Sequence, residues 1–211
     1  LEAMRHTAPD ARMYQAGSSE MFGNECDEDG FRRETTLMRP VSPYGCAKLY
    51  AYNLCRVYRS SYDMFIANGI LFNHESPRRG LNFVTNKVVD AAVKIYHGKQ
   101  RELALGNLDA TRDWGHAKDY VRAMWMMLQH DKPDDFVCAM GESHSIKDLC
   151  EEVFGELEMD YMDYVTINHK YFRPTELHTL KGDCSKLKET FGWKPEYTFR
   201  SMIEEMIAAR L

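Results

Sequence analysis

The chain has 211 residues, of which 44% are hydrophobic and 28% are charged, and these proportions are typical of globular domains with a buried core. Lys and Arg number 27 and Asp and Glu number 32, so the formal net charge of −5 argues against nucleic acid as a partner. No apolar run approaches the ~18 residues of a membrane span, and the first residues lack the layout of a signal peptide, so we expect no membrane partner.

The first third of the chain predicts a strand, a loop, a long helix and a second strand. Residues 12–16 favour a short strand, and the charged, irregular segment 24–40 is typical of a surface loop. A Ser-Pro pair at 42–43 predicts the start of a helix that runs to about residue 62, since Ser caps helices and Pro is tolerated in the first turn. Residues 64–72 form a nearly continuous apolar run, as expected for a parallel strand covered on both faces.

The rest of the chain keeps alternating between strands and helices. After a polar loop at 73–80, we predict helices over 83–96, 113–129, 145–157, 184–191 and 198–209, and strands over 103–105 and 136–140. Ser145, with Asp148 three residues later, has the pattern of a capping box. The alternation predicts an α/β fold: a partial Rossmann-like, doubly wound parallel sheet with a smaller mixed α/β lobe.

Six cysteines are scattered along the chain, at positions 26, 46, 55, 138, 150 and 184. They form no C-x-x-C pair, and no His lies at zinc-finger spacing from them. We interpret them as reduced, mostly buried thiols of a cytoplasmic protein, and we predict neither a disulfide framework nor a metal site.

These residues contain no glycine-rich phosphate cradle. An α/β chain that binds a dinucleotide normally begins with a strand and a G-x-G-x-x-G turn, whereas the first glycine here is Gly17 and isolated glycines follow. We therefore expect the chain to be a fragment of a longer protein, without the N-terminal, Gly-rich part of a nucleotide-binding lobe.

A Tyr44-x-x-x-Lys48 pair lies near the start of the first predicted helix. Positions four apart share one helix face, and an ammonium near a phenol favours the phenolate, which suits general acid–base work. The spacing alone is weak evidence, because Tyr and Lys fall four apart by chance in many helices. Its context, Ser-Pro-Tyr-Gly-x-Ala-Lys, is far less common.

Two further segments follow predicted strands, where ligands bind in open α/β sheets. Ser18 and Glu20 offer a hydroxyl and a carboxylate there, although a serine-rich turn with a solvated Glu is the simpler interpretation of that tetrapeptide alone. In the segment 73–80, Arg78 and Arg79 can clamp a phosphate or a carboxylate, although an isolated Arg pair more often marks a solvated loop.

Three spaced basic residues offer a further candidate site. Lys87, Arg112 and Arg173 are each ordinary surface residues when taken alone. Together they would supply a diphosphate pocket in a protein whose net charge is negative. Their spacing leaves both interpretations open.

These residues lie in stretches by which the chain resembles the GDP-mannose 4,6-dehydratase family, a branch of the extended short-chain dehydrogenase/reductases. The most specific stretches are Leu-Phe-Asn-His-Glu-Ser-Pro at 71–77 and Gly-Asn-Leu-Asp-Ala-x-Arg-Asp-Trp-Gly-His-Ala at 106–117. Matching segments extend over nearly the whole chain, at 18–23, 39–52, 71–80, 83–87, 105–121 and 171–195.

The resemblance implies a role for each candidate residue. It implies catalysis by Ser18, Glu20, Tyr44 and Lys48. It implies cofactor binding by Lys48, His74 and Arg79. It implies that five residues surround the sugar nucleotide: Asn73, Lys87, Arg112, Arg173 and Glu176. We therefore expect Glu20 and Tyr44 to converge on one cleft with Lys48.

The implied reaction is a redox-neutral dehydration of GDP-mannose to GDP-4-keto-6-deoxymannose, a precursor of deoxyhexoses such as fucose, with NADP as cofactor. Tyr44 would remove the 4-hydroxyl proton as hydride leaves C4 for NADP⁺. Glu20 would take the C5 proton and help water leave from C6, where the hydride then returns. Two alternatives stay open: another NAD(P)-dependent sugar-nucleotide epimerase or dehydratase, and a non-catalytic remnant that only binds a sugar nucleotide.

The resemblance also implies an organisation for the chain. Residues 1–73 and 113–140 would belong to the NADP-binding Rossmann lobe, and residues 74–112 and 141–211 to the substrate lobe. The protein is expected to be a homo-oligomer, either a dimer or a tetramer.

Overall fold

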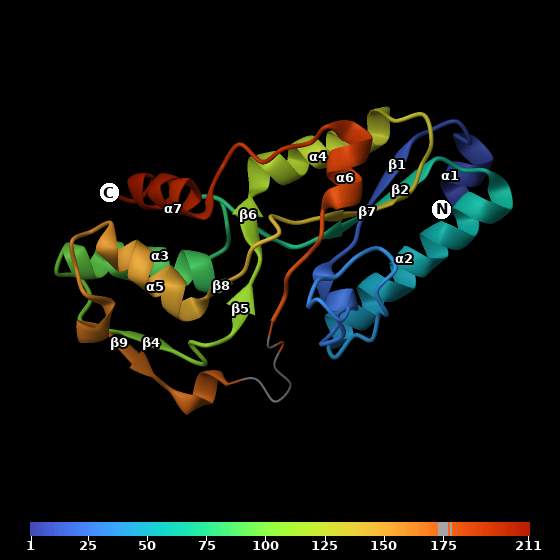
Figure 1. The fold of residues 1–211 in the computed structure, drawn as a ribbon. Helices are drawn as coiled ribbons and strands as arrows, with labels where there is room; N and C mark the ends of the chain where they lie inside the picture. Colours follow the sequence, from blue (N-terminus) through green and yellow to red (C-terminus); the bar gives the residue numbers. More distant parts are fainter. Residues whose placement is uncertain (173–176, 178) are drawn as a thin grey trace.

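The computed structural model describes residues 1–172, 177 and 179–211. Within this part of the chain the elements gather around two main hydrophobic cores. In Figure 1 the group that holds the N-terminus lies on the right, and the group that holds the C-terminus lies on the left.

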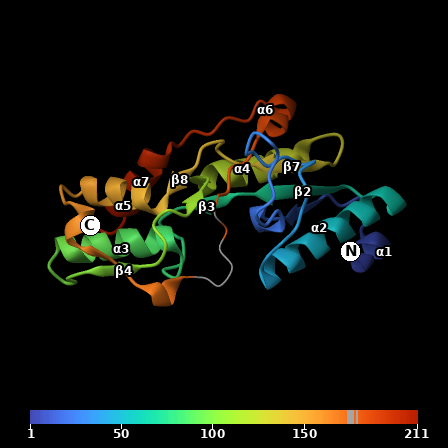
Figure 2. The same cartoon turned by 60° about the horizontal axis from the view of Figure 1, so that its bottom comes forward.

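The first core surrounds a three-stranded parallel sheet in the order β1 (Met13–Ala16), β2 (Ile66–Leu71) and β7 (Asp135–Cys138). Every residue of β2 is buried, because helices α2 (Pro43–Tyr62) and α4 (Ala117–Gln129) cover the sheet from opposite sides (Figures 1 and 2). This arrangement explains why β2 is apolar except for Asn68, and it confirms the predicted α/β fold with a parallel sheet.

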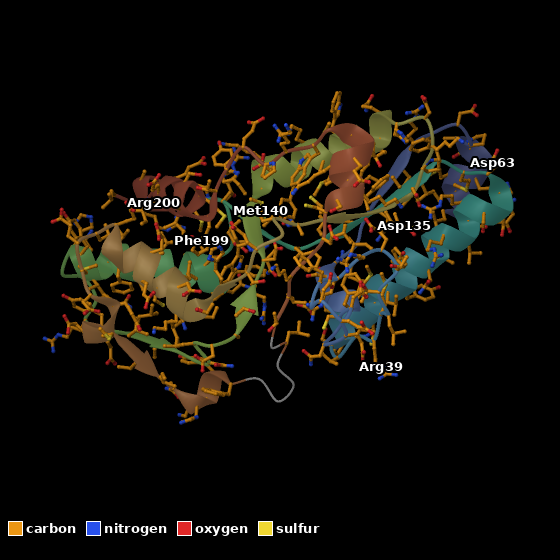
Figure 3. All side chains as sticks on the ribbon, in the orientation of Figure 1. Arg39, Asp63, Asp135, Met140, Phe199 and Arg200 are labelled. Atoms are coloured by element: carbon orange, nitrogen blue, oxygen red, sulfur yellow. The ribbon has the colours of Figure 1, made fainter. Side chains whose placement is uncertain are left out.

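Helix α2 begins where the sequence predicts. The Oγ of Ser42 accepts a hydrogen bond from the Gly45 N–H at 2.9 Å, and the helix ends at Asp63, whose φ of 51° is left-handed. On the buried side of the helix, Tyr52 donates a 2.8 Å hydrogen bond to Asp135, which is labelled on the sheet in Figure 3. The carboxylate of Asp135 therefore ties the helix to the sheet.

The second core lies between helices α3 (Val84–Tyr96), α5 (Ile146–Gly155) and α7 (Phe199–Ala208). A short parallel pair, β4 (Leu103–Leu105) and β9 (Val165–Ile167), borders this group. Each helix packs against the other two, as expected for amphipathic helices that share one apolar core.

The end of the chain returns to the first core before α7. Helix α6 (Ser185–Phe191) packs against β7, and Leu187 and Trp193 are buried in the first core. The indole N–H of Trp193 donates to the carbonyl of Asp119 at 3.0 Å, which links this segment to α4. The C-terminal segment therefore contacts both cores, and the lobe boundaries given above stay a prediction.

Two predicted boundaries are wrong around a short parallel pair. The segment 73–80 starts as strand β3 (Asn73–Glu75) rather than as a loop, and its partner β6 (Trp114–His116) occupies the first residues of the helix predicted over 113–129. All of β6 is buried, and α4 begins only after His116, whose Nδ1 accepts a hydrogen bond from the Lys118 N–H. Strands of this length carry too little periodicity to be recognised in a sequence.

Several short elements are also absent from the sequence prediction. They are α1 (Glu2–Thr7), strand β9, the antiparallel pair β5 (Thr111–Arg112) and β8 (His144–Ser145), and the 3-10 turns η1 (Ser19–Met21), η2 (Tyr161–Asp163) and η3 (His169–Tyr171). The predicted capping box of α5 is confirmed, because Ser145 and Asp148 each accept a hydrogen bond from the other's backbone N–H.

The cysteines follow the prediction in part. Four are buried as expected, whereas Cys26 and Cys46 are exposed. Among the described residues, no helix combines the length and the apolar character needed to cross a membrane.

Candidate active site

The turn after β1 places Ser18 and Glu20 at the carboxyl end of the sheet. The Oγ of Ser18 accepts a hydrogen bond from the Glu20 N–H at 3.2 Å and so caps the turn η1. The N–H of Gly17 donates to the Gly69 carbonyl at 2.7 Å. A Cβ at position 17 would lie 2.6 Å from that oxygen, so this close approach to β2 requires glycine.

Helix α2 brings Tyr44 and Lys48 to the same end of the sheet. Gly45 lets the first helical turn pack directly on Glu20, because a Cβ there would lie 2.7 Å from the Glu20 carbonyl oxygen. The Nζ of Lys48 donates to the Ala16 carbonyl at 2.9 Å and lies 5.6 Å from the centre of the Tyr44 ring. Tyr44 is 53% exposed, so its ring is open to a ligand.

Most of the predicted catalytic residues line one cavity of about 110 Å³. Its lining includes Ser18, Glu20, Tyr44, Asn73, His74 and Arg79. Lys48 contacts the end of β1 instead and is not among the lining residues. The structure thus brings three predicted catalytic residues and two predicted cofactor contacts together at one place, while their chemical roles stay predictions.

A larger cavity of about 410 Å³ adjoins the first, since Asn73 lines both. Its wall contains Lys87, Arg112 and the ring of Tyr171. The Nζ of Lys87 lies 4.3 Å from the centre of that ring and donates to a main-chain carbonyl of β4 at 2.9 Å. Two predicted substrate contacts fall outside the described residues: Arg173 and Glu176. The wall therefore carries two cationic side chains in a protein of negative net charge.

The ion pair of Glu75 and Arg79 lies between the two cavities, because Glu75 lines the larger one and Arg79 the smaller one. The Nε of Arg79 is 3.1 Å from Oε2 of Glu75, and the hydroxyl of Thr85 donates to the same oxygen at 2.7 Å. Burial raises the pKa of Glu75 to about 6, although the nearby Arg79 acts in the opposite direction. The sequence interpretation does not single out Glu75, although a carboxylate in the polar segment that follows a buried apolar strand is a usable signal.

The side chain of His74 is held firmly in the wall of the smaller cavity. Its Nδ1 lies 2.9 Å from the Phe72 carbonyl, and its ring stacks on Tyr120 with the ring centres 4.8 Å apart. Burial lowers the pKa of His74, so the imidazole is neutral at pH 7. Because the carbonyl can only accept, Nδ1 carries the hydrogen and Nε2 is left as an acceptor.

Comparison with known proteins gives the family of the chain. The model of the family described as GDP-mannose 4,6 dehydratase matches residues 1–206. The chain belongs to the GDP-mannose 4,6 dehydratase family. It is 50% identical over 211 residues to GDP-mannose 4,6 dehydratase 2 of Arabidopsis thaliana, an alignment that covers 98% of this chain and 56% of the relative. It is 47% identical over 215 residues to GDP-mannose 4,6 dehydratase of Homo sapiens, with 94% and 57% covered.

The chain spans a little more than half the length of these curated relatives. Among solved structures, RMD from Pseudomonas aeruginosa complexed with NADPH is similar, with a TM-score of 0.89 and 20% identity over 99% of this chain and 69% of that one. This likeness confirms the predicted Rossmann-like fold, and the family match confirms the resemblance carried by the sequence motifs.

Proposed function

We propose that the protein containing this chain is a GDP-mannose 4,6-dehydratase, a lyase that converts GDP-mannose into GDP-4-keto-6-deoxymannose and water. The observation that carries the proposal is the carboxylate of Glu20, which shares one cavity with Tyr44. Loss of water requires a proton taken from C5 and a proton delivered to the 6-hydroxyl, whereas inversion at C4 requires no such carboxylate. Membership of the family supports the same reaction.

The residues of the smaller cavity divide the proton transfers between them. Tyr44 removes the proton of the 4-hydroxyl, and Ser18 hydrogen-bonds the same hydroxyl. The Glu20 carboxylate takes the proton from C5, which the C4 ketone makes acidic, and passes a proton to the hydroxyl that leaves C6 as water. The C5–H and C6–O bonds break, a C5–C6 double bond forms, and Glu20 ends as a carboxylate. C5 later takes up a proton from solvent, and Tyr44 returns its proton to solvent.

We further propose NADP as the cofactor, held in part by Lys48, His74 and Arg79. The residues present fit a nicotinamide ribose, because Lys48 stands at the carboxyl end of β1 while the Nε2 acceptor of His74 and the guanidinium of Arg79 line the adjacent cavity. When bound, the cofactor accepts a hydride from C4 and returns it at C6. The NADPH in the similar P. aeruginosa RMD structure supports a nicotinamide dinucleotide here.

The larger cavity suits the nucleotide end of the substrate. Its volume of about 410 Å³ lies within the range of roughly 300–1,000 Å³ found for small-molecule sites. Lys87 and Arg112 offer positive charge for a diphosphate, and Asn73 can reach both parts of the ligand because it lines both cavities. Arg173 and Glu176 complete the proposed set of substrate contacts.

The proposal extends to the organisation of the protein. The two hydrophobic cores support a division into two lobes, for which we propose residues 1–73 and 113–140 as the cofactor lobe and residues 74–112 and 141–211 as the substrate lobe. Leu187 and Trp193 of the latter pack in the first core. A homo-oligomer, either a dimer or a tetramer, and a cytoplasmic location are proposed from the family resemblance and the scattered thiols.

The direct test is to incubate the full-length protein with GDP-mannose and NADP⁺ and to identify the product by NMR. We expect a 4-keto-6-deoxy sugar nucleotide, and a loss of about 10²–10⁴-fold in turnover for Glu20→Gln, which keeps the shape of the side chain but cannot exchange a proton. A C4-inverted sugar with the 6-hydroxyl retained would instead identify an epimerase. Binding of GDP-mannose without turnover would identify a non-catalytic protein.

A further inference from the structure

Ser42 makes two hydrogen bonds through a single hydroxyl group. Its Oγ accepts from the Gly45 N–H at 2.9 Å, which caps helix α2, and it lies 2.8 Å from Oε2 of Glu20. An ionised carboxylate can only accept, so the hydroxyl hydrogen of Ser42 is directed at Glu20. The helix cap thus fixes the orientation of the hydroxyl that contacts Glu20.

The main chain of Glu20 lies against the same helical turn. Gly45 has no Cβ to separate the turn from the Glu20 carbonyl, which a methyl group there would approach to 2.7 Å. Tyr44 belongs to this turn and lines the cavity together with Glu20. The first turn of α2 therefore carries one proposed acid–base residue and, through Ser42, contacts the carboxylate of the other.

We propose that Ser42 is a positioning residue for Glu20 in the dehydration described above, on which this inference rests. Its hydroxyl anchors Oε2 of Glu20, and we assign proton transfer to and from the substrate to the other oxygen, Oε1, which Ser42 does not contact. A glutamate has several rotatable bonds, and without this donor the carboxylate would populate rotamers that do not face C5. Ser42 keeps its own proton throughout and touches no reacting atom.

Substitutions in the full-length protein separate the helix cap from the contact with Glu20. Ser42→Thr keeps the hydroxyl and both of its hydrogen bonds. Ser42→Gly removes the hydroxyl at a position where glycine is well tolerated as a helix cap. Thr198→Gly is the matched control: Thr198 caps α7 in the second core, where its Oγ1 accepts from the Ser201 N–H at 3.1 Å.

We expect kcat of Ser42→Gly to fall about 10²-fold, because a misplacement of about 1 Å costs this much in rate, while KM for GDP-mannose stays close to the parental value. The primary isotope effect from deuterium at C5 should rise, since removal of that proton becomes the slow step. Ser42→Thr should restore parental turnover. Thr198→Gly should change the Tm by about as little as Ser42→Gly does, and it should leave kcat at the parental value.

Parental turnover with an unchanged isotope effect in Ser42→Gly would overturn the role of Ser42. If that variant does not fold, Ser42→Asp takes its place, because Asp caps helices well. Its carboxylate would repel that of Glu20 instead of donating to it, so a loss of kcat at least as large is expected, and parental turnover would overturn the proposal. Glu20→Gln separates this inference from the proposed function. If the Glu20→Gln enzyme is active, the proposed dehydratase mechanism is wrong. If Glu20→Gln is inactive and Ser42→Gly is fully active, only the positioning role of Ser42 is wrong.

Discussion

The buried carboxylate of Glu75 makes the stability of the fold depend on pH. Its side chain is 2% exposed, and burial raises its pKa from the ordinary value of 4.5 to about 6. Between these two pH values the folded chain binds more protons than the unfolded chain, so the free energy of unfolding falls as the pH rises. The difference between the two pKa values corresponds to a contribution of about 2 kcal/mol to the free energy of unfolding. This contribution is fully present below pH 4.5 and is lost above pH 6.

The substitution Glu75→Gln removes this titration but keeps an oxygen that can accept the hydroxyl of Thr85. We expect the variant to gain about 2 kcal/mol relative to the parent as the pH rises from 4.5 to above 6. Urea unfolding at a series of pH values measures the difference between the two proteins.

The low-pH end of that series provides the internal control. Below pH 4.5 both proteins carry a neutral group at position 75, so the difference there gives the effect of the substitution itself. A difference that stays constant across the whole series would refute the argument from burial. A difference that changes in the opposite direction would mean that the ion pair with Arg79 outweighs the desolvation of Glu75.

Three further substitutions test single contacts by urea unfolding. Ser145→Ala should cost about 1 kcal/mol, because it removes the capping box of α5; an unchanged stability would mean that the cap contributes nothing. Trp193→Ala should lower the free energy of unfolding by about 3–5 kcal/mol, since the indole is 1% exposed and donates to a buried carbonyl of α4. A smaller loss would show that the first core collapses around the gap. Gly17→Ala should cost about 1–3 kcal/mol through its clash with the neighbouring strand, whereas Gly155→Ala, whose Cβ would meet open space, should be neutral or stabilising; equal effects would refute the clash.

The elements that the sequence predicts correctly are those with a long local pattern. Strand β2 is recognisable because all six of its residues are buried, and a strand covered on both faces is mostly apolar; its one polar side chain, Asn68, donates a hydrogen bond to Asp135. Helix α2 is recognisable because its N-cap and first residue, Ser42 and Pro43, form a Ser-Pro pair at the start of a helix of 20 residues. The pair β3 and β6 escapes prediction because each strand has three residues, and what stabilises them is pairing with a segment distant in the sequence.

In the candidate site, too, the sequence predicts what depends on a local pattern and misses a contact between distant segments. The spacing of Tyr44 and Lys48 is local, so the sequence carries it, and the carboxyl end of β1 is a predictable place for Glu20. The hydrogen bond between Ser42 and Glu20 joins two elements 22 positions apart, and only the fold reveals it. The sequence suffices to interpret Ser42 as a helix cap, but its contact with the carboxylate depends on how tightly Gly45 lets α2 approach.

The short strand β3 determines which side chains serve which cavity. Successive side chains of a strand point to opposite faces, and accordingly Asn73 and Glu75 line the larger cavity whereas His74 lines the smaller one. Asn73, at the start of the strand, reaches both cavities. A shift of one residue in the pairing with β6 would exchange the two sets of side chains. The register that pairs Glu75 with His116 therefore fixes which side chains of β3 line each cavity, although the two strands pair over only three residues.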